Sequence, residues 1–340
     1  MCNRATDHLI FQTFDWAWRG WTCVASVRGR QLNVVVGRLG ARVVLIWPLT
    51  TRRFLGLSIA SALDSETTEY REIVVEDGPG REDWVSQAWD FVTRQRGVDA
   101  LYLQYLPEDG LLDTAAHLHR GVASGREGRR YLDCRSFPDW ANYFQSLSSN
   151  RRSDIRRRRR RLEERAAVKT VRITEGEQLE EFLSWFFETK YSALSDVAGT
   201  TNWFTAPEHR EFLTSILHDG LRSGVTVATA IMADGNYIAG KVYADYRQTR
   251  NLLVTTYDRD WALFAPGVLL YEEAVRGAFD GGFHTIDFRL GDEPFKTAWI
   301  NRTGTVCDYW IPCTPLDKMY VNWRKSALRR LLKRGLDFLR

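Results

Sequence analysis

The sequence predicts an α/β protein with about two domains. The first observation is its length, because 340 residues exceed what one ordinary core requires. The second is its pattern, in which short β-branched runs alternate with helix-spaced apolar positions, as in a sheet flanked by helices. The third is that 44% hydrophobic and 13% aromatic residues supply material for two cores. We therefore expect a globular α/β fold.

The first part of the chain predicts a helix followed by an antiparallel meander. Phe11, Phe14, Trp18 and Trp21 recur at intervals of three or four, which predicts one helix with an aromatic face. Apolar runs predict strands at 24–26, 32–36, 43–49 and 100–106. Helical spacing recurs at 84–92 and 111–119, whereas 76–83, with its glycines and proline, reads as a loop.

Residues 137–165 are strongly helical and carry the densest charge of the chain. Six consecutive arginines, 156–161, cover every face of a helix, so they are more than the solvated side of an amphipathic segment. We expect partial neutralisation by ligand phosphates, by acidic side chains, by an anionic membrane surface or by nucleic acid. Arg157 and Arg160 are the predicted substrate-binding pair. The alternative is a solvated linker helix.

The second half predicts a strand, two helices and a three-stranded meander. A long loop at 195–205, which carries Trp203, suits a binding loop. Asp234-Gly235 is a hairpin signal between the strands at 225–232 and 237–246. The other elements are a strand at 168–173, helices at 177–191 and 207–222, and a strand at 251–257.

Pro266 and Gly267 then open a helix that follows the fourth strand of this half. Proline suits a first helical turn, and glycine lets an anion approach the free N–H groups there. This end is a candidate pyrophosphate seat. Gly281-Gly282 ends the helix, and 284–288 reads as the next strand. The alternative is that Pro-Gly is only a helix start.

Together with Gly291-Asp292-Glu293-Pro294-Phe295-Lys296, the Pro266-Gly267 pair resembles the motifs of CelD/BcsL-type acetyltransferases. These are a branch of the GNAT acyltransferase superfamily related to FemAB-like transferases. The resemblance extends over about 11–308, although its specific part is short. It implies two tandem GNAT-like domains with mixed, mostly antiparallel sheets flanked by helices.

The resemblance also implies boundaries and a donor site. A GNAT-like domain without a clear cofactor motif would span 1–138, a basic linker helix 139–167, a second GNAT domain 168–314 and a basic amphipathic helix 315–340. The second domain would bind acetyl-CoA or another acyl-CoA, without a metal, between its parted fourth and fifth strands. The predicted cofactor-binding residues are Pro266, Gly267, Val268, Leu269 and Lys296. Lys190 stands where the family commonly has a lysine, and its alternative role is a charge at a helix C-terminus.

The chemistry requires a base for the acceptor and a proton for the leaving thiolate. Asp258, Asp287, Asp292, Glu293 and His284 are candidate bases near the strand ends, and Asp292 is preferred because it follows Gly291 in a loop. Phe295 replaces the usual tyrosine of the family and has no hydroxyl, so either Tyr257 or Tyr271 supplies the proton or the family tyrosine is not catalytic. The predicted catalytic residues are Asp292, Asp258 and Tyr257, and the predicted substrate-binding residues are Lys190, Trp203, Arg157 and Arg160.

The function implied is acyl transfer from acyl-CoA to an amine or hydroxyl, with a saccharide as one acceptor, since CelD-like proteins are associated with polysaccharide production. One alternative is a FemAB-like transferase with an aminoacyl-tRNA donor. Another is a non-catalytic module that binds anions or nucleic acid. Nucleic acid is not favoured, because a net charge of +4 is mild for this length.

The remaining features favour a cytoplasmic protein. Five cysteines without metal-ligand spacing support neither zinc nor a disulfide framework. The first residues show no secretory or transit pattern, and no run approaches a spanning helix. The basic amphipathic helix near the end packs on the body of the protein or attaches it peripherally to the inner face of an anionic membrane.

Overall fold

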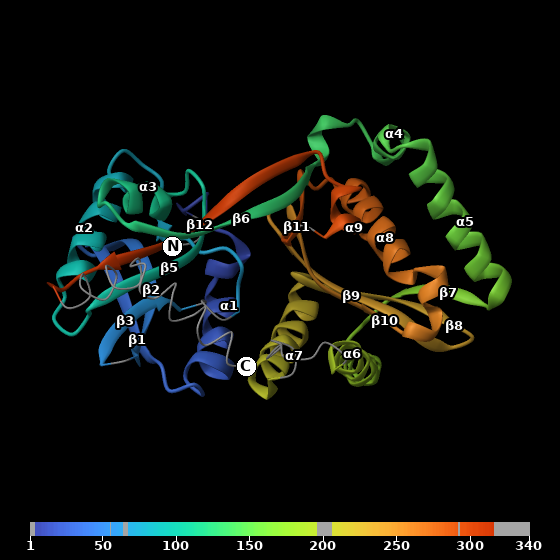
Figure 1. Ribbon diagram of the computed structural model, residues 1–340, viewed down its shortest axis with the longest axis horizontal. Coiled ribbons are helices and arrows are strands. Elements are labelled where there is room, and N and C mark those ends of the chain that lie inside the picture. The colour runs from blue at the N-terminus through green and yellow to red at the C-terminus, as the bar shows by residue number, and fades with distance from the viewer. Residues whose placement is uncertain (1–3, 55, 64–66, 196–205, 292, 316–340) are drawn as a thin grey trace, which may run out of the picture. The chain divides into compact units, whose positions relative to one another are not determined.

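The computed structural model describes residues 4–54, 56–63, 67–195, 206–291 and 293–315 (Figure 1). The chain forms two compact units, Met1–Glu127 with Thr305–Arg340, and Gly128–Gly304. Each unit has a mixed, mostly antiparallel sheet with helices against it, so the predicted α/β class is confirmed. Most of the basic C-terminal helix expected at 315–340 lies outside the described residues. Within the described part of the chain, no helix has the length and apolar character needed to cross a bilayer.

The first unit contains a five-stranded sheet in the order β1-β2-β3-β5-β12, with a short β4 beside β2. The strands β3 and β5 are parallel, and they pair only from Ile59–Ser61 to Ala100–Tyr102. Its elements are η2 (Ile10–Gln12), α1 (Phe14–Arg19), η3 (Gly20–Ala25), β1 (Gln31–Leu39), β2 (Arg42–Phe54), β3 (Leu57–Ala62), β4 (Val74–Val75), α2 (Arg81–Arg94), β5 (Ala100–Pro107), α3 (Leu111–Leu118) and β12 (Arg302–Pro312).

The predicted strand at 24–26 is wrong. The amide of Ser26 donates to the carbonyl of Trp21 at 3.0 Å, which extends the helical segment as a π-helix through Ala25. The single aromatic helix face is also wrong, because Thr13 is extended (φ −68°, ψ 155°) and separates two helices. Phe11 is therefore buried, whereas Phe14 is 72% exposed.

The second unit contains the sheet order β6-β11-β10-β9-β8-β7. Helix α6 covers one face, where a Cβ built on Gly240 of β9 would lie within 3.0 Å of Phe182, Trp185 and Phe186. Helix α8 covers the other face, and α5 packs outside it (Figure 1). The elements are β6 (Val122–Asp133), η4 (Cys134–Ser136), α4 (Trp140–Ser146), α5 (Ser149–Arg165), β7 (Val168–Arg172), α6 (Glu177–Ser195), α7 (Pro207–Ser223), β8 (Thr226–Ala233), β9 (Asn236–Tyr246), β10 (Thr249–Tyr257), η6 (Arg259–Phe264), α8 (Pro266–Asp280), β11 (Thr285–Leu290) and α9 (Pro294–Thr297).

The β8–β9 hairpin turns at Asp234-Gly235, as the sequence predicts. Both residues have positive φ, 49° and 86°, which is the conformation of a type I′ turn. Asp234 also accepts a hydrogen bond from the amide of Ala167 at 2.9 Å, so the turn is tied to the start of β7. The hairpin places Lys241 opposite Thr255 by way of the β9–β10 pairing that follows it.

Two strands pass between the units along the chain. β6 begins in the first unit, and its second half pairs with β11 in the second, from Asp133 to Arg129. β12 leaves the second unit and pairs with β5 in the first. The first unit therefore completes its sheet with a strand from outside its main run of sequence, whereas the second unit is contiguous.

The basic helix α5 is anchored within the second unit. Ile155 and Leu162 are buried in the core that α8 shares. Arg159 donates to Glu272 and to Glu273 of α8, at 2.8 Å each. Other arginines lie over aromatic rings: Arg151 over Trp299, Arg156 over Phe144, Arg161 over Phe264 and Arg165 over Trp261.

In the first unit, the Glu72 carboxyl lies against the first turn of α3. Its Oε1 accepts from the amides of Ile73 at 2.9 Å and of Leu112 at 3.1 Å. Burial of this carboxyl group raises its pKa to about 7, and the backbone hydrogen bonds only partly oppose that effect.

The raised pKa of Glu72 predicts stability that falls as pH rises. In the folded state the Glu72 carboxyl keeps its proton up to pH about 7, whereas in the unfolded chain it loses this proton near pH 4.5. The free energy of unfolding should therefore drop by on the order of 2–3 kcal/mol from pH 4.5 to 7 through this group. Glu72→Gln, which retains the accepting oxygen and stays neutral, should remove that dependence in urea unfolding at pH 5 and pH 8. Glu82→Gln, at an exposed position in α2, is the control, and equal pH dependence in both variants would contradict the prediction.

The contacts of α5 predict different stability effects for neighbouring arginines. Arg159→Gln should lower the free energy of unfolding by about 1–2 kcal/mol, because it leaves two partly buried carboxylates of α8 unpaired. Among the described residues Arg160 pairs only with Glu164 of its own helix and is exposed, so Arg160→Gln should change stability by less than about 0.5 kcal/mol. Urea unfolding of both variants measures the difference, which should disappear in a Glu272→Gln/Glu273→Gln background.

Candidate functional site

The strands β10 and β11 run parallel for three residue pairs and then separate. The pairs join Thr249 to Thr285, Arg250 to Ile286 and Asn251 to Asp287. Beyond them, β10 continues along β9 as far as Tyr257. β11 instead continues along β6, with an irregularity at Arg289, whose φ is 71°. Parted parallel strands of this kind offer backbone groups on both sides to a ligand.

Two buried ion pairs fix the point of separation. Asp287 is fully buried and accepts from Arg129 of β6 at 2.9 Å (Nε) and 2.7 Å (second guanidinium nitrogen). Arg250 donates to both oxygens of Asp245, at 2.8 and 2.7 Å, and to the carbonyl of Ala274 in α8 at 2.8 Å. β11 is thus held to β6, and β10 is held to β9 and α8.

Helix α8 begins beside the end of β10 without an acidic or capping side chain. Its N-cap, Ala265, has the left-handed conformation (φ 46°, ψ 56°), which is strained for alanine before proline. The first turn contains no carboxylate, and Val268 donates its amide to Ala265 at 2.9 Å. A Cβ built on Gly267 would make only ordinary contacts, at 3.5 Å to Tyr257 and 3.9 Å to Thr255. The helix dipole at this end favours an anion.

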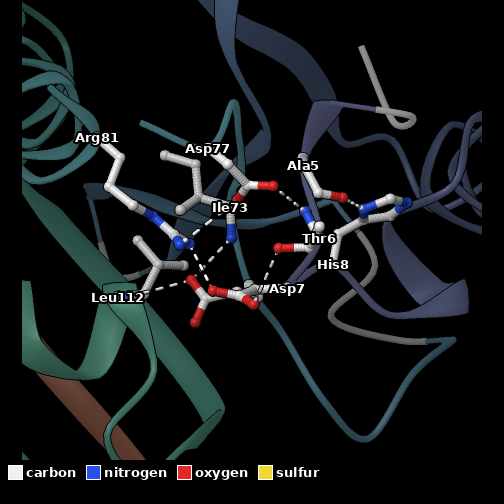
Figure 2. Close-up of polar contacts among 9 residues, drawn as sticks. Ala5, Thr6, Asp7, His8, Ile73, Asp77, Arg81 and Leu112 are labelled. Atoms are coloured by element: carbon white, nitrogen blue, oxygen red, sulfur yellow. Dashed lines mark hydrogen bonds and ion pairs between the residues drawn. The ribbon is translucent and has the colours of Figure 1, made fainter. Parts of the chain in front are cut away.

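The corresponding helix of the first unit, α2, has the opposite character. It follows β3 and precedes β5, the parallel pair of that unit. Its first residue, Arg81, pairs with Asp7 at 2.6 Å and with Asp77 at 3.5 Å (Figure 2). Glu82 and Asp83 add two carboxylates to the first turn. These negative charges disfavour an anion at α2, so the two helix starts are not interchangeable.

Three lysines converge beside β10 in the second unit. Lys241 of β9 has no exposed surface, donates to Oγ1 of Thr255 at 2.8 Å and lies 3.3 Å from the ring centre of Tyr271. Lys190 of α6 donates to the carbonyl of Thr255 at 3.0 Å. Lys296 donates to the carbonyl of Leu290 and lies 2.8 Å from Glu293.

The electrostatics of this lysine cluster, Lys190, Lys241 and Lys296, follow from burial and like charge. Burial, and then the charges of Lys296 and Lys190, hold the pKa of Lys241 well below its ordinary value. Burial also lowers the pKa of Lys190. Burial raises the pKa of Tyr271 to about 12, although a hydrogen bond with the Thr255 hydroxyl opposes the rise.

The structure brings several predicted site residues together. Gly267, Lys190 and Tyr257 all lie around Thr255 and the start of α8. Asp258 caps η6, because its Oδ1 accepts from the amide of Asp260 at 3.0 Å. Asp292 and Trp203 lie outside the described residues. The catalytic roles of Asp258, Asp292 and Tyr257 remain predictions.

Arg157 and Arg160 lie on α5 and not in the lysine cluster. Arg157 shares Asp154 with Arg158, at 2.7 and 2.6 Å, and Arg160 lies 3.4 Å from Glu164. Arg157 also lines an open cavity of about 390 Å³ with Asn150, Ser153 and Asp154. Much of the arginine charge is therefore balanced within the second unit, and the substrate role of this pair remains a prediction.

Lys241 and Thr255 are not among the site residues predicted from the sequence. A signal was present, because Lys241 interrupts the apolar run from Ile238 to Ala244. A charged residue in a buried strand requires a specific environment. Thr255 gave no such signal, since threonine is ordinary in a strand.

Comparisons with known proteins cover this part of the chain. Residues 149–297, less than half of the chain, match the model of a family described as an acetyltransferase (GNAT) domain. The matched range extends from α5 to α9 and includes the parted strands, the start of α8 and the lysine cluster. A search of curated proteins found no significant match.

Solved structures show the fold of the whole chain. FemX is similar with a TM-score of 0.66 and 12% identity, over 93% of this chain and 95% of that one. A conserved protein of unknown function from Bacteroides thetaiotaomicron is similar with a TM-score of 0.57 and 12% identity, over 89% of this chain and 92% of that one. The C-terminal domain of a putative lysylphosphatidylglycerol synthetase from Agrobacterium fabrum is similar with a TM-score of 0.52 and 10% identity, over 90% of this chain and 94% of that one. At these identities the likeness concerns the fold alone, and it confirms the predicted pair of GNAT-like α/β domains.

Proposed function

We propose that this protein transfers an acyl group from acyl-CoA to an amine or hydroxyl acceptor. The observation that carries the proposal is the parting of β10 from β11 beside an uncapped helix start, within the range that matches a GNAT domain. A GNAT domain implies an acyl-CoA co-substrate.

The residues at the start of α8 fit the pyrophosphate of acyl-CoA. Gly267 has no side chain in the way, the first turn carries no carboxylate, and Ala265 keeps a strained conformation that ordinary helix packing does not require. The amides around Gly267 and Leu269 would donate to the pyrophosphate, after Pro266 directs the chain into the helix. The acyl arm would then enter the space between β10 and β11, where it meets the lysine cluster.

The acceptor side of the proposal rests on the family resemblance. A saccharide in polysaccharide biosynthesis is the proposed acceptor, and Lys190, Trp203, Arg157 and Arg160 are its proposed ligands. Asp292 remains the proposed base, with Asp258 as the alternative. We also propose a cytoplasmic location, with peripheral contact between the basic segment at 315–340 and the inner membrane face.

A second candidate is a FemAB-like transferase that uses an aminoacyl-tRNA donor. The similarity of fold to FemX and the exposed side chains of Arg157 and Arg160 favour it. The internal pairing of Arg158 and Arg159 reduces the charge available to RNA, which places this candidate second.

Calorimetry with acetyl-CoA and with tRNA should distinguish these functions. Acyl transfer from acyl-CoA predicts saturable acetyl-CoA binding and weak RNA binding that decreases steeply with salt. A transfer assay with amino sugars then tests acceptors. Tight, selective tRNA binding without acetyl-CoA binding would select the FemAB-like function, and RNA binding without any transfer would select a binding module.

Gly267→Val should weaken acetyl-CoA binding by at least about tenfold. A β-branched side chain at this position obstructs the backbone amides, and one lost charge-assisted hydrogen bond accounts for about 1.5–3 kcal/mol. The unliganded melting temperature should change little, because a Cβ fits there. Gly304→Val is the matched control, since a Cβ there also makes only ordinary contacts, at 3.6 Å or more. Parental affinity in Gly267→Val would place the donor elsewhere.

A further inference from the structure

We propose that one face of the sheet edge in the first unit docks on an anionic phospholipid bilayer. This face, the outer face, consists of Leu32, Val34 and Val36 of β1, with Arg52 and Phe54 of β2 beside them. The proposal is independent of the proposed acyl transfer. It also concerns a surface other than the basic segment at 315–340.

The edge strand β1 has apolar side chains on both faces of the sheet. Val35 packs into the core that α2 covers, and it pairs with the buried Trp47 of β2. Leu32, Val34 and Val36 point to the other face, because side chains alternate along a strand, and they are 38–47% exposed. Sheets that meet water on one face ordinarily carry polar side chains there, so an apolar outer face calls for a partner.

Exposed apolar surface is concentrated in this region of the chain. Among the described residues, fourteen large hydrophobic side chains are exposed, and eight of them lie between Phe14 and Phe54. Besides the four that belong to the outer face, they are Phe14, Trp18, Val27 and Leu39. Clustering of this kind marks an interaction surface, whereas single exposed apolar residues are ordinary.

The same region is strongly positive. Residues 14–63 contain seven arginines, no lysine and one carboxylate, Asp15, so their net charge of +6 exceeds the +4 of the whole chain. Arg42 is neutralised by Glu76, which lies outside this stretch, at 3.1 Å. The remaining excess of positive charge favours an anionic partner.

Arginine and apolar side chains meet at one end of the outer face. Leu32 pairs with Thr50, so Arg52, two residues further along β2, emerges on the same face. The guanidinium of Arg52 lies 5.6 Å from the ring centre of Phe54. Arg28 is exposed in the turn that leads into β1 at this end. Such a mixture suits the bilayer interface, where apolar groups enter and guanidinium groups stay near the phosphates.

The composition of this face favours a bilayer over other occupants. Its aliphatic side chains offer no rings on which nucleic-acid bases could stack. Antiparallel pairing with a second copy about Val34 would set Arg30 near Arg38 of that copy, and like charges oppose this. Residues 316–340 contain eight lysines and arginines against two aspartates, so like charge also opposes their packing here. An anionic bilayer satisfies both the apolar and the basic side chains.

Vesicle binding by the full chain tests the electrostatic part. The parent should sediment with vesicles of phosphatidylglycerol and phosphatidylcholine, and much less with phosphatidylcholine alone. Arg28→Gln/Arg52→Gln should weaken binding to the anionic vesicles by about tenfold or more, because each arginine near the surface adds attraction. The charge-matched control is Arg94→Gln/Arg96→Gln, at the end of α2, and it should stay within about threefold of the parent.

Val34→Thr/Val36→Thr tests the apolar part. Threonine keeps the β-branched shape that suits a strand, so β1 should persist. Binding to the anionic vesicles should fall by about threefold or more, because hydroxyl groups replace methyl groups that would enter the interface. Leu118→Gln, at an exposed position on α3, is the control and should bind as the parent does. Thermal melts followed by circular dichroism establish that each variant is folded.

Hydrogen exchange locates the contact in the unaltered chain. Anionic vesicles should slow the exchange of amides within 27–36 and 52–54, whereas phosphatidylcholine vesicles should leave it unchanged. The amides of α2 are the internal control, because this helix covers the other face of the sheet. Protection confined to residues after 315 would assign membrane contact to the basic segment and overturn the proposal.

The remaining outcomes also decide the proposal. A folded parent that does not bind anionic vesicles overturns it, as does parental vesicle binding in both the arginine and the valine variants. A dimer that Val34→Thr/Val36→Thr dissociates would assign the face to a second copy, and tRNA binding lost in Arg28→Gln/Arg52→Gln, without vesicle binding, would assign it to nucleic acid. Acetyl-CoA affinity should be the same in all of these variants, so failure here is distinguishable from failure of the proposed acyl transfer.

Discussion

The second unit depends on the separation of two parallel strands at a fixed residue. A sheet gains free energy from every pair it adds, so strands that part require a competing attraction. Asp287 supplies it on one side through Arg129, and Arg250 supplies it on the other through Asp245. Arg250 donates to both oxygens of Asp245, whereas both nitrogens of the partly exposed Arg129 donate to one oxygen of the buried Asp287, so each pair depends on geometry. Loss of one partner would leave a buried charge beside the candidate site. Both the strand separation and the site therefore depend on these two ion pairs.

The lysine cluster shows how the same separation shapes chemistry. Where strands part, carbonyl groups lose neighbouring amides, and long cationic side chains can reach them. Lys190 donates to the carbonyl of Thr255 in this way, and Lys296 donates to the carbonyl of Leu290. Their charges in turn act on Lys241, which the β9–β10 pairing holds opposite Thr255. The two lysines thus supply hydrogen bonds to backbone carbonyls at the parted strands, and burial, together with their positive charges, lowers the pKa of Lys241.

Local signals allowed most of the fold to be predicted from the sequence. Asp234-Gly235 identified its hairpin because the turn requires positive φ, and Pro266 identified the start of α8 because proline fits a first turn. β6 is polar and contains glycine, β12 begins with a polar, glycine-containing segment, and both pair with strands distant in sequence, so they were missed. The π-helix near Trp21 has no simple sequence pattern. In the site, sequence motifs identified Gly267 and Lys296. Thr255 could not be identified in this way, because its contacts arise only from the strand pairing and helix packing around it.

The passage of β6 and β12 between the units affects how the chain is made on the ribosome. The first unit cannot close its sheet when residue 127 emerges, because β12 follows the whole of the second unit. At translation speeds of about 5–20 residues per second, that delay is on the order of ten seconds or more. During it, β5 has an open edge on one side, which is a target for wrong pairing and for chaperones. The second unit, contiguous in sequence, is free to mature first, so the order of folding would reverse the order of synthesis.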